Sequence, residues 1–87
     1  MQADAKKIMR YLKTARGQID GIMKMIEEDR YCIDISTQLM ATQGLLNKAN
    51  KDILAAHMRH CVNEATQEEG REEKIEEMIK VIDKLVK

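Results

Sequence analysis

The sequence predicts an all-helical fold, for three reasons. Proline is absent from the 87 residues and glycine occurs only four times, which leaves few residues to form the turns of a many-stranded fold. There is no Phe or Trp and only two Tyr, so the core has to be built from Ile, Leu, Met, Val and Ala, a mixture that suits helices better than sheets. These apolar residues also recur every three or four positions, which is the period of a helix.

The first helix is expected over about residues 4–28. Its apolar residues alternate steps of four and three, the spacing of a coiled-coil stripe. They are Ile8, Leu12, Ala15, Ile19, Ile22 and Ile26. Gly17 and Gly21 stand beside this stripe, where the missing Cβ predicts tight packing against another helix. The polar run 27–30 then predicts a break in the helix.

Two more helices are expected, over about residues 31–62 and 71–86. Large apolar residues of the second alternate with small ones, as in an interdigitated bundle. The large residues are Ile35, Leu39, Leu46 and Ile53, and the small ones are Thr42, Ala49 and Ala56. The polar segment 63–70 contains a glycine and predicts a connection. The third helix has one apolar face, formed by Ile75, Met78, Ile79, Ile82, Leu85 and Val86.

The chain is expected to form one domain, over residues 1–87, and to form an oligomer. A chain this short buries a modest fraction of its surface when it folds alone. The second helix would be about 48 Å long, longer than either neighbour, so a monomer would leave part of its apolar face uncovered. Both observations favour a dimer or a tetramer built on the second helix.

Charge is distributed unevenly, although the net charge is zero. Residues 64–87 carry eight acidic residues against five basic ones, whereas the first 16 residues hold a single acidic one. The basic residues of that first segment are Lys6, Lys7, Arg10, Lys13 and Arg16. No apolar run approaches the roughly 20 residues of a membrane span or forms a signal peptide, so we expect a cytoplasmic protein with no membrane partner.

His57 and Cys61 are four residues apart on the second helix, so both project from one face and can chelate a metal ion. Cys32 lies 25 residues before His57, about 37 Å away along a continuous helix, and cannot join them within the same helix. If the second helix pairs antiparallel with its copy, Cys32 of one subunit can meet His57 and Cys61 of the other. Such a dimer has two equivalent sites.

Two thiolates and one imidazole favour Cu(I), which accepts few ligands, over structural Zn(II), which usually takes four. His60 could supply a fourth nitrogen. Other interpretations stay open at this point, because a buried cysteine is often a small apolar residue and the seven methionines more plausibly fill the core than form a copper cluster. Without an export signal, the two cysteines favour thiols, metal ligands or redox sensors over a structural disulfide.

Three segments of the chain resemble the CsoR/RcnR family of metal-sensing repressors. They are Leu12-Lys13-Thr14-Ala15-Arg16-Gly17-Gln18-Ile19-Asp20-Gly21-Ile22, Tyr31-Cys32-Ile33-Asp34-Ile35 and His57-Met58-Arg59-His60-Cys61. The resemblance runs from about residue 5 to the C-terminus. It implies an antiparallel four-helix-bundle dimer, paired into a dimer of dimers, that binds operator double-stranded DNA and releases it when an inducer binds.

The resemblance also implies roles for individual residues. In the copper-sensing branch the ligands match Cys32 of one subunit and His57 and Cys61 of another, and Tyr31 and Glu77 match positions that support the ligand histidine. Nickel and cobalt sensors are similar but use more nitrogen ligands, including a histidine near the N-terminus, and persulfide sensors lack the intervening histidine. Formaldehyde sensors keep the first cysteine but not the second. The ligand set of this chain therefore points to copper.

A DNA-binding surface is expected on the first two helices. Lys6, Arg10, Lys13 and Arg16 keep helical spacing, which fits either a solvated face or contact with phosphates. Arg16, Gln18 and Lys48 match family positions implicated in DNA contact, whereas Tyr11 stands where many members carry Arg, which leaves operator preference open.

The resulting hypothesis is a Cu(I)-responsive repressor that binds DNA in the metal-free form. The alternatives are a thiol repressor of the same fold that senses persulfide or disulfide chemistry, and a metal-buffering helical protein that does not bind DNA. The residues suggest neither a nucleotide motif nor an arrangement of nucleophile, base and oxyanion donors. We therefore do not expect an enzyme.

Overall fold

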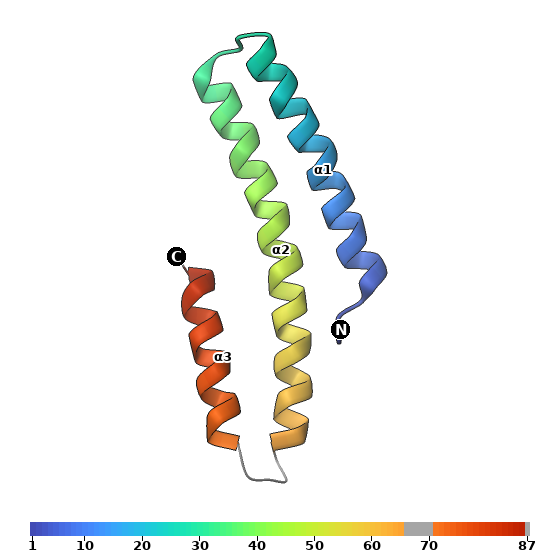
Figure 1. The fold of residues 1–87 in the computed structure, drawn as a ribbon, viewed down its shortest axis with the longest axis vertical. Coiled ribbons are helices and arrows are strands. Elements are labelled where there is room, and N and C mark those ends of the chain that lie inside the picture. Colours follow the sequence, from blue (N-terminus) through green and yellow to red (C-terminus); the bar gives the residue numbers. More distant parts are fainter. Residues whose placement is uncertain (66–70, 87) are drawn as a thin grey trace.

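The computed structural model describes residues 1–65 and 71–86, and it describes side chains for residues 1–60 and 72–84. The described chain forms three helices, α1 (Ala5–Glu27), α2 (Cys32–Ala65) and α3 (Arg71–Val86), and its residues include no strand. α1 and α3 lie on opposite sides of α2 and run antiparallel to it (Figure 1). The all-helical prediction is confirmed. Within the described residues, no helix is long and apolar enough to cross a membrane.

The predicted ends of α1 and α3 agree with the structure within about one residue, but the predicted end of α2 is wrong. We expected this helix to stop near Val62, whereas it continues to Ala65. Residues 63–65 contain neither glycine nor proline, and Glu64 and Ala65 favour a helix, so their polarity alone does not end it. The remainder of the expected connection, 66–70, lies outside the described residues.

Both ends of α1 are capped. The Asp4 carboxylate accepts hydrogen bonds from the backbone N–H groups of Lys6 at 3.0 Å and Lys7 at 3.3 Å, which satisfies two donors at the start of the helix. At the other end Asp29 adopts a left-handed conformation with φ of 54°, and the Arg30 N–H donates to the Met25 carbonyl at 3.0 Å. This is a Schellman motif with Asp in the place usually taken by glycine, and it reverses the chain within residues 28–31.

The α1–α2 hairpin buries only every seventh residue of the predicted stripes. Ile8, Ala15 and Ile22 are buried on α1, whereas the other stripe members Leu12, Ile19 and Ile26 are exposed. The buried residues of α2 are the small ones, Thr42, Ala49 and Ala56. Within the subunit the hairpin therefore leaves Leu12, Ile19 and Ile26 of the predicted α1 stripe uncovered, because the buried residues of α2 are small.

The large apolar residues of α2 are instead left at the surface, with Leu39 46% and Leu46 43% exposed. The subunit has 7007 Å² of accessible surface, against about 5,200 Å² for a monomeric protein of this mass. Its radius of gyration is 17.4 Å, against about 12 Å for a compact domain of this length. A Cβ at Gly17 or Gly21 would meet nothing within 4 Å, so no described residue of the subunit packs tightly against these glycines. The subunit therefore exposes enough apolar surface to favour association with other copies of the chain.

Candidate metal centre

α2 carries all three predicted ligands on one of its faces. Cys32 is its first residue, and His57 and Cys61 lie about 37 Å and 44 Å further along the helix. A turn of about 100° per residue brings both of them to within about 20° of the direction of Cys32 around the helix axis. Cys32 and His57 are exposed, and Cys32 is a free thiol. The side chain of Cys61 lies outside the described residues.

One subunit does not bring these residues together. Because α2 is continuous, Cys32 at its start and His57 are about 37 Å apart in one subunit. Among the described side chains, no three His, Cys, Asp or Glu residues are grouped so that they could hold a metal ion. Leu39 and Leu46 lie between the two ends on the same exposed face. The donors therefore flank an exposed apolar surface.

His57 lies in a pocket of about 390 Å³ where three segments of the subunit meet. α3 contributes Glu77 and Val81, and the residues before α1 contribute Met1 and Gln2. The remaining lining residues are Ile53 and Leu54 of α2. Glu77 and His57 thus line the same pocket, and the supporting role of Glu77 stays a prediction. Nothing in the spacing of residues 1–4 indicated that this segment would also reach His57.

Tyr31 lies at the other end of α2, next to Cys32, and is 68% exposed. Within one subunit it is therefore as remote from His57 as Cys32 is. Tyr31 and Cys32 can approach His57 only from another copy of the chain. The structure brings Glu77 and His57 together in a subunit, and it separates Tyr31 and Cys32 from both.

The donor set fits a soft metal ion. Thiolates and imidazole are the ligands that Cu(I) accepts at low coordination number, whereas Mg²⁺ and Ca²⁺ prefer oxygen. The exposed thiol of Cys32 and the exposed ring of His57 are both accessible to an ion from solvent. Glu77 can accept a hydrogen bond from a ligating imidazole, the kind of contact that orients such rings.

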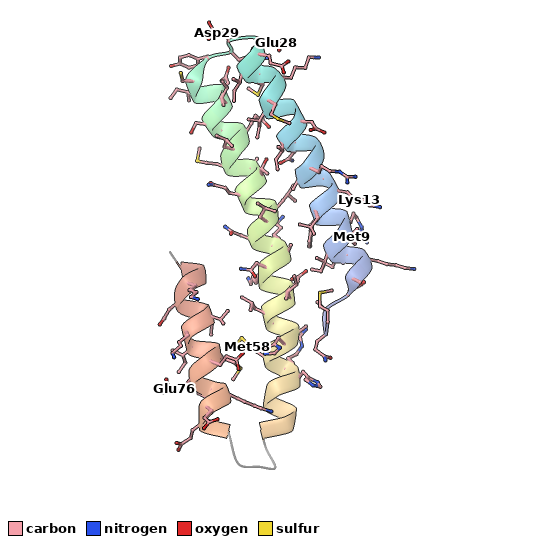
Figure 2. All side chains as sticks on the ribbon, in the orientation of Figure 1. Met9, Lys13, Glu28, Asp29, Met58 and Glu76 are labelled. Atoms are coloured by element: carbon pink, nitrogen blue, oxygen red, sulfur yellow. The ribbon has the colours of Figure 1, made fainter. Side chains whose placement is uncertain are left out.

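Three of the predicted DNA-binding residues share one edge of α1. Lys6, Arg10 and Lys13 are exposed and line a shallow hollow of about 410 Å³ together with Ala5 and Met9. Figure 2 shows Lys13 projecting from the edge of α1 that faces away from α2. We call Lys6, Arg10 and Lys13 the basic edge.

The other predicted DNA-binding residues lie apart from the basic edge. Arg16 is exposed on α1 but about a quarter-turn away around the helix, and Lys48 is exposed on α2. Gln18 is turned into the hairpin, where its side-chain oxygen accepts a hydrogen bond of 2.8 Å from the hydroxyl of Thr42. The predicted DNA-binding residues therefore do not form one surface of the subunit. Arg16 and Lys48 are exposed elsewhere, and Gln18 is bonded to Thr42 inside the hairpin.

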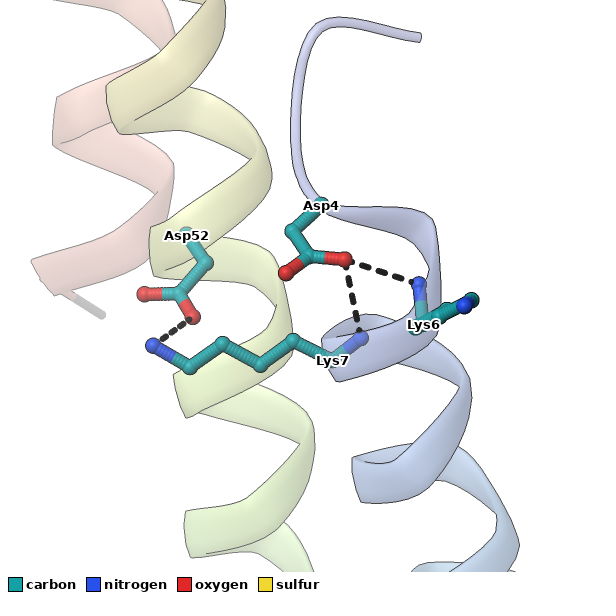
Figure 3. A network of polar contacts seen from close by, with 4 residues as sticks. All are labelled: Asp4, Lys6, Lys7 and Asp52. Carbon is teal, nitrogen blue, oxygen red and sulfur yellow. Dashed lines mark hydrogen bonds and ion pairs between the residues drawn. The ribbon is translucent and has the colours of Figure 1, made fainter.

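Lys7 is set apart from its basic neighbours by an ion pair that spacing alone does not indicate. Its ammonium lies 3.3 Å from the Asp52 carboxylate of α2, whereas Lys6 projects away from α2 (Figure 3). The hydrogen bond to Asp52 and the negative charge of that carboxylate raise the pKa of Lys7 above its ordinary value. Lys7 thus fastens the start of α1 to α2 instead of joining the basic edge.

Comparison with known proteins identifies the family. Residues 4–84 match the family described as metal-sensitive transcriptional repressor. The copper-sensing transcriptional repressor CsoR of Mycobacterium ulcerans (strain Agy99) is 41% identical over 71 residues, which cover 82% of this chain and 61% of that protein. The chain thus spans less than two thirds of this relative.

Two solved structures share the fold. The copper-sensing repressor CsoR with Cu(I) from Geobacillus thermodenitrificans NG80-2 has a TM-score of 0.81 at 39% identity, over 94% of this chain and 85% of that one. The nickel-responsive transcriptional regulator InrS has a TM-score of 0.82 at 28% identity, over 98% of this chain and 96% of that one. These two relatives respond to different metals on one fold. The chain belongs to the CsoR/RcnR family of metal-sensitive transcriptional repressors, which are not enzymes.

Proposed function

We propose that the protein is a Cu(I)-responsive repressor that binds operator DNA as a metal-free oligomer and releases it when Cu(I) is bound. The proposed ligands are Cys32 of one subunit with His57 and Cys61 of the partner subunit. The observation that carries this proposal is that the three residues lie on one face of the continuous helix α2, with Cys32 at its start and the other two near its end. Cys32 and His57 are exposed on this face.

An antiparallel pair of α2 helices would complete the sites. With the two-fold axis near Leu46, midway between Cys32 and Cys61, each Cys32 lies beside the other subunit's His57 and Cys61, which gives two equivalent sites. The same pairing covers Leu39 and Leu46, which are two of the exposed large apolar residues of α2. With α1 of each subunit it forms a four-helix bundle, and we propose that two such dimers associate into a tetramer.

Copper is favoured over other metals by the donors and not by the fold, which a nickel-responsive protein shares. Two thiolates and one imidazole match the preference of Cu(I) for soft ligands at low coordination number. Bound Cu(I) would supply a strong link between the start of one α2 and the end of the other. The relatives named as copper-sensing support the same choice.

Two neighbouring residues would prepare His57 for this role. Glu77 lines the same pocket and can accept a hydrogen bond from the imidazole nitrogen that faces away from the metal, which fixes the ring orientation. Tyr31 is next to Cys32 and would arrive at the same site from the partner subunit. Glu77 belongs to α3, and Tyr31 belongs to the turn between α1 and α2. The proposed site would therefore include residues of α2, of α3 and of the α1–α2 turn.

DNA would be held mainly by phosphate contacts from the basic edge of several subunits. Lys6, Arg10 and Lys13 are exposed on this edge, and Arg16 and Lys48 are additional proposed contacts. Gln18 could contact DNA only after giving up its hydrogen bond with Thr42. Because each subunit contributes one edge, DNA affinity depends on how the edges are spaced in the oligomer. A change in the relative position of two α2 helices would alter that spacing and release the DNA.

Comparing Lys13→Gln with Lys7→Gln tests the assignment of the basic edge. We expect Lys13→Gln to weaken DNA binding and to reduce the slope of log affinity against log salt by about 0.9 for each phosphate that is no longer neutralised. Lys7→Gln removes the same charge six residues earlier, but that charge faces Asp52, so the slope should be nearly unchanged. Fluorescence anisotropy of the metal-free protein at several salt concentrations measures both slopes. Equal slopes for the two variants would contradict the assignment.

A further inference from the structure

One acidic residue of α2, Asp52, lies among basic side chains on one face of the α1–α2 hairpin. Lys48 comes one helical turn before it and Arg59 two turns after it, so the three side chains leave α2 within about 40° of one another around its axis. Lys48 and Arg59 are exposed, and Lys7 reaches the same face from α1 (Figure 3). Lys48 is also one of the proposed DNA contacts. Asp52 thus places a negative charge within a group of three cations.

The ion pair with Asp52 keeps Lys7 in place because one carboxylate oxygen depends on it. The Lys7 ammonium lies 3.3 Å from Asp52 Oδ2. This oxygen is buried, and apart from Lys7 the described residues offer it no hydrogen-bond partner. If Lys7 turned to a DNA phosphate, the oxygen would be left buried and uncompensated. Such a loss costs more than an exposed ion pair gains, so Lys7 stays with Asp52.

The other carboxylate near Lys7, that of Asp4, has a different partner. Asp4 lines a pocket of about 210 Å³ together with Lys7, Asp52 and Arg59. Its side chain accepts the backbone hydrogen bonds that cap α1, which occupies it at the start of the helix. Asp52 is therefore the carboxylate that neutralises the ammonium of Lys7.

We propose that Asp52 limits the DNA affinity of the protein by holding Lys7 out of contact with the phosphates. This inference rests on the proposed function, because it requires that the protein binds DNA. Lys7 and Asp52 together carry no net charge, so the pair displaces no counterion from DNA. Without the carboxylate charge, Lys7 would be a free cation next to Lys6 of the basic edge and on the same face as Lys48. It could then neutralise a phosphate.

The test measures the salt dependence of DNA binding by the reduced, metal-free full chain. The probe is one fluorescein-labelled duplex, selected from random-sequence DNA by the unsubstituted protein and used for every variant. Asp52→Asn removes the charge and keeps the shape of the side chain, and Asp52→Asn/Lys7→Gln also removes the ammonium. Glu76→Gln is the matched control, because it removes one negative charge from an exposed residue on the outer side of α3 (Figure 2). Circular dichroism checks that each variant keeps its helices.

We expect Asp52→Asn to tighten DNA binding and to steepen the slope of log affinity against log salt. The change in slope should be about 0.9 for each subunit whose Lys7 reaches a phosphate, which is a factor of about 3.5 in affinity between 50 and 200 mM salt. The double variant should return to the slope of the unsubstituted protein, because the freed cation is gone. Glu76→Gln should keep that slope.

Three results would overturn the role of Asp52 and leave the proposed function standing. They are an unchanged slope in Asp52→Asn, a steeper slope that persists in the double variant, and an equal steepening in Glu76→Gln. A shallower slope in Lys7→Gln would have the same meaning, because Lys7 would then already contact DNA, and this variant decides the question even if Asp52→Asn does not fold. If the unsubstituted protein selects no duplex, the proposed function fails together with the inference.

Discussion

A dimer assembled from one Cys32→Ala subunit and one Cys61→Ala subunit should bind Cu(I) tightly at about one site, whereas neither variant should do so alone. In the mixed dimer, the intact Cys32 of the second subunit meets the intact His57 and Cys61 of the first. The other site lacks both cysteines. Homodimers of either variant have no site with all three ligands. Co-expression with two different tags isolates the mixed species, and chelator competition measures its copper content.

The mixed dimer separates a shared site from a site within one subunit. If the ligands came from one chain, neither subunit of the mixed dimer would hold a complete set, and mixing would restore nothing. A mixed dimer of Cys32→Ala with the double variant Cys32→Ala/Cys61→Ala is the matched control, because it has no intact Cys32 in either arrangement. Tight binding in this control, or none in the complementary pair, would contradict the shared site.

Replacing His57 with Ala should uncouple DNA binding from copper. In the unsubstituted protein we expect Cu(I) to lower DNA affinity by roughly 5- to 150-fold, the usual range of allosteric coupling. His57→Ala keeps the basic edge, so its metal-free DNA affinity should stay within about twofold, and Cu(I) should change that affinity by no more than the same factor. The side chain is exposed, so its removal leaves no large cavity in the subunit.

His60→Ala is the matched comparison, since it removes a second imidazole from the same stretch of α2. His60 is partly buried and lies about 60° away from His57 around the helix axis. We expect this variant to keep the copper response. A His57→Ala protein that still releases DNA with copper, or a His60→Ala protein that no longer does, would remove His57 from its proposed role.

The helices could be predicted from the sequence because their signals are local. A period of three to four, the absence of proline and a polar break at 27–30 suffice to predict α1 and the start of α2. Which stripe members are buried depends on the partner surface. The buried residues of α1 are seven positions apart, as are the buried Ala49 and Ala56 of α2. Leu12, Ile19 and Ile26 remain exposed. Predicting which of these residues are buried requires the register of α1 against α2, and the apolar period does not determine that register.

The position of the turn determines which residues of α1 and α2 lie opposite each other in the hairpin. Lys7 with Asp52, and Gln18 with Thr42, are placed nearly symmetrically about residues 29 and 30, where Asp29 takes its left-handed conformation. A polar run predicts that the chain breaks but not the exact residue about which it folds back. The ion pair of Lys7 and the inward turn of Gln18 could therefore not be foreseen, although both affect which residues are available to DNA.

The ligand set of the candidate metal centre is a prediction from the sequence, and the sequence did not indicate which other segments surround it. The spacing of Cys32, His57 and Cys61 indicates one helix face, and the structure agrees for the continuous helix that carries them. The sequence did not indicate that Met1 and Gln2 would line the His57 pocket, because a short irregular segment has no periodicity. Glu77 could be placed by resemblance alone, since its spacing in an acidic helix is that of an ordinary solvated charge.

The most direct measurement is the DNA affinity of the reduced, unsubstituted protein at fixed salt, with and without one Cu(I) per subunit. The proposed function predicts tight Cu(I) binding, and DNA affinity lowered by at least about fivefold when copper is bound. Tight copper binding with unchanged DNA affinity would indicate a metal buffer. DNA release by persulfide or disulfide formation at Cys32, together with weak Cu(I) binding, would indicate a thiol sensor. Either result would contradict a copper-responsive repressor.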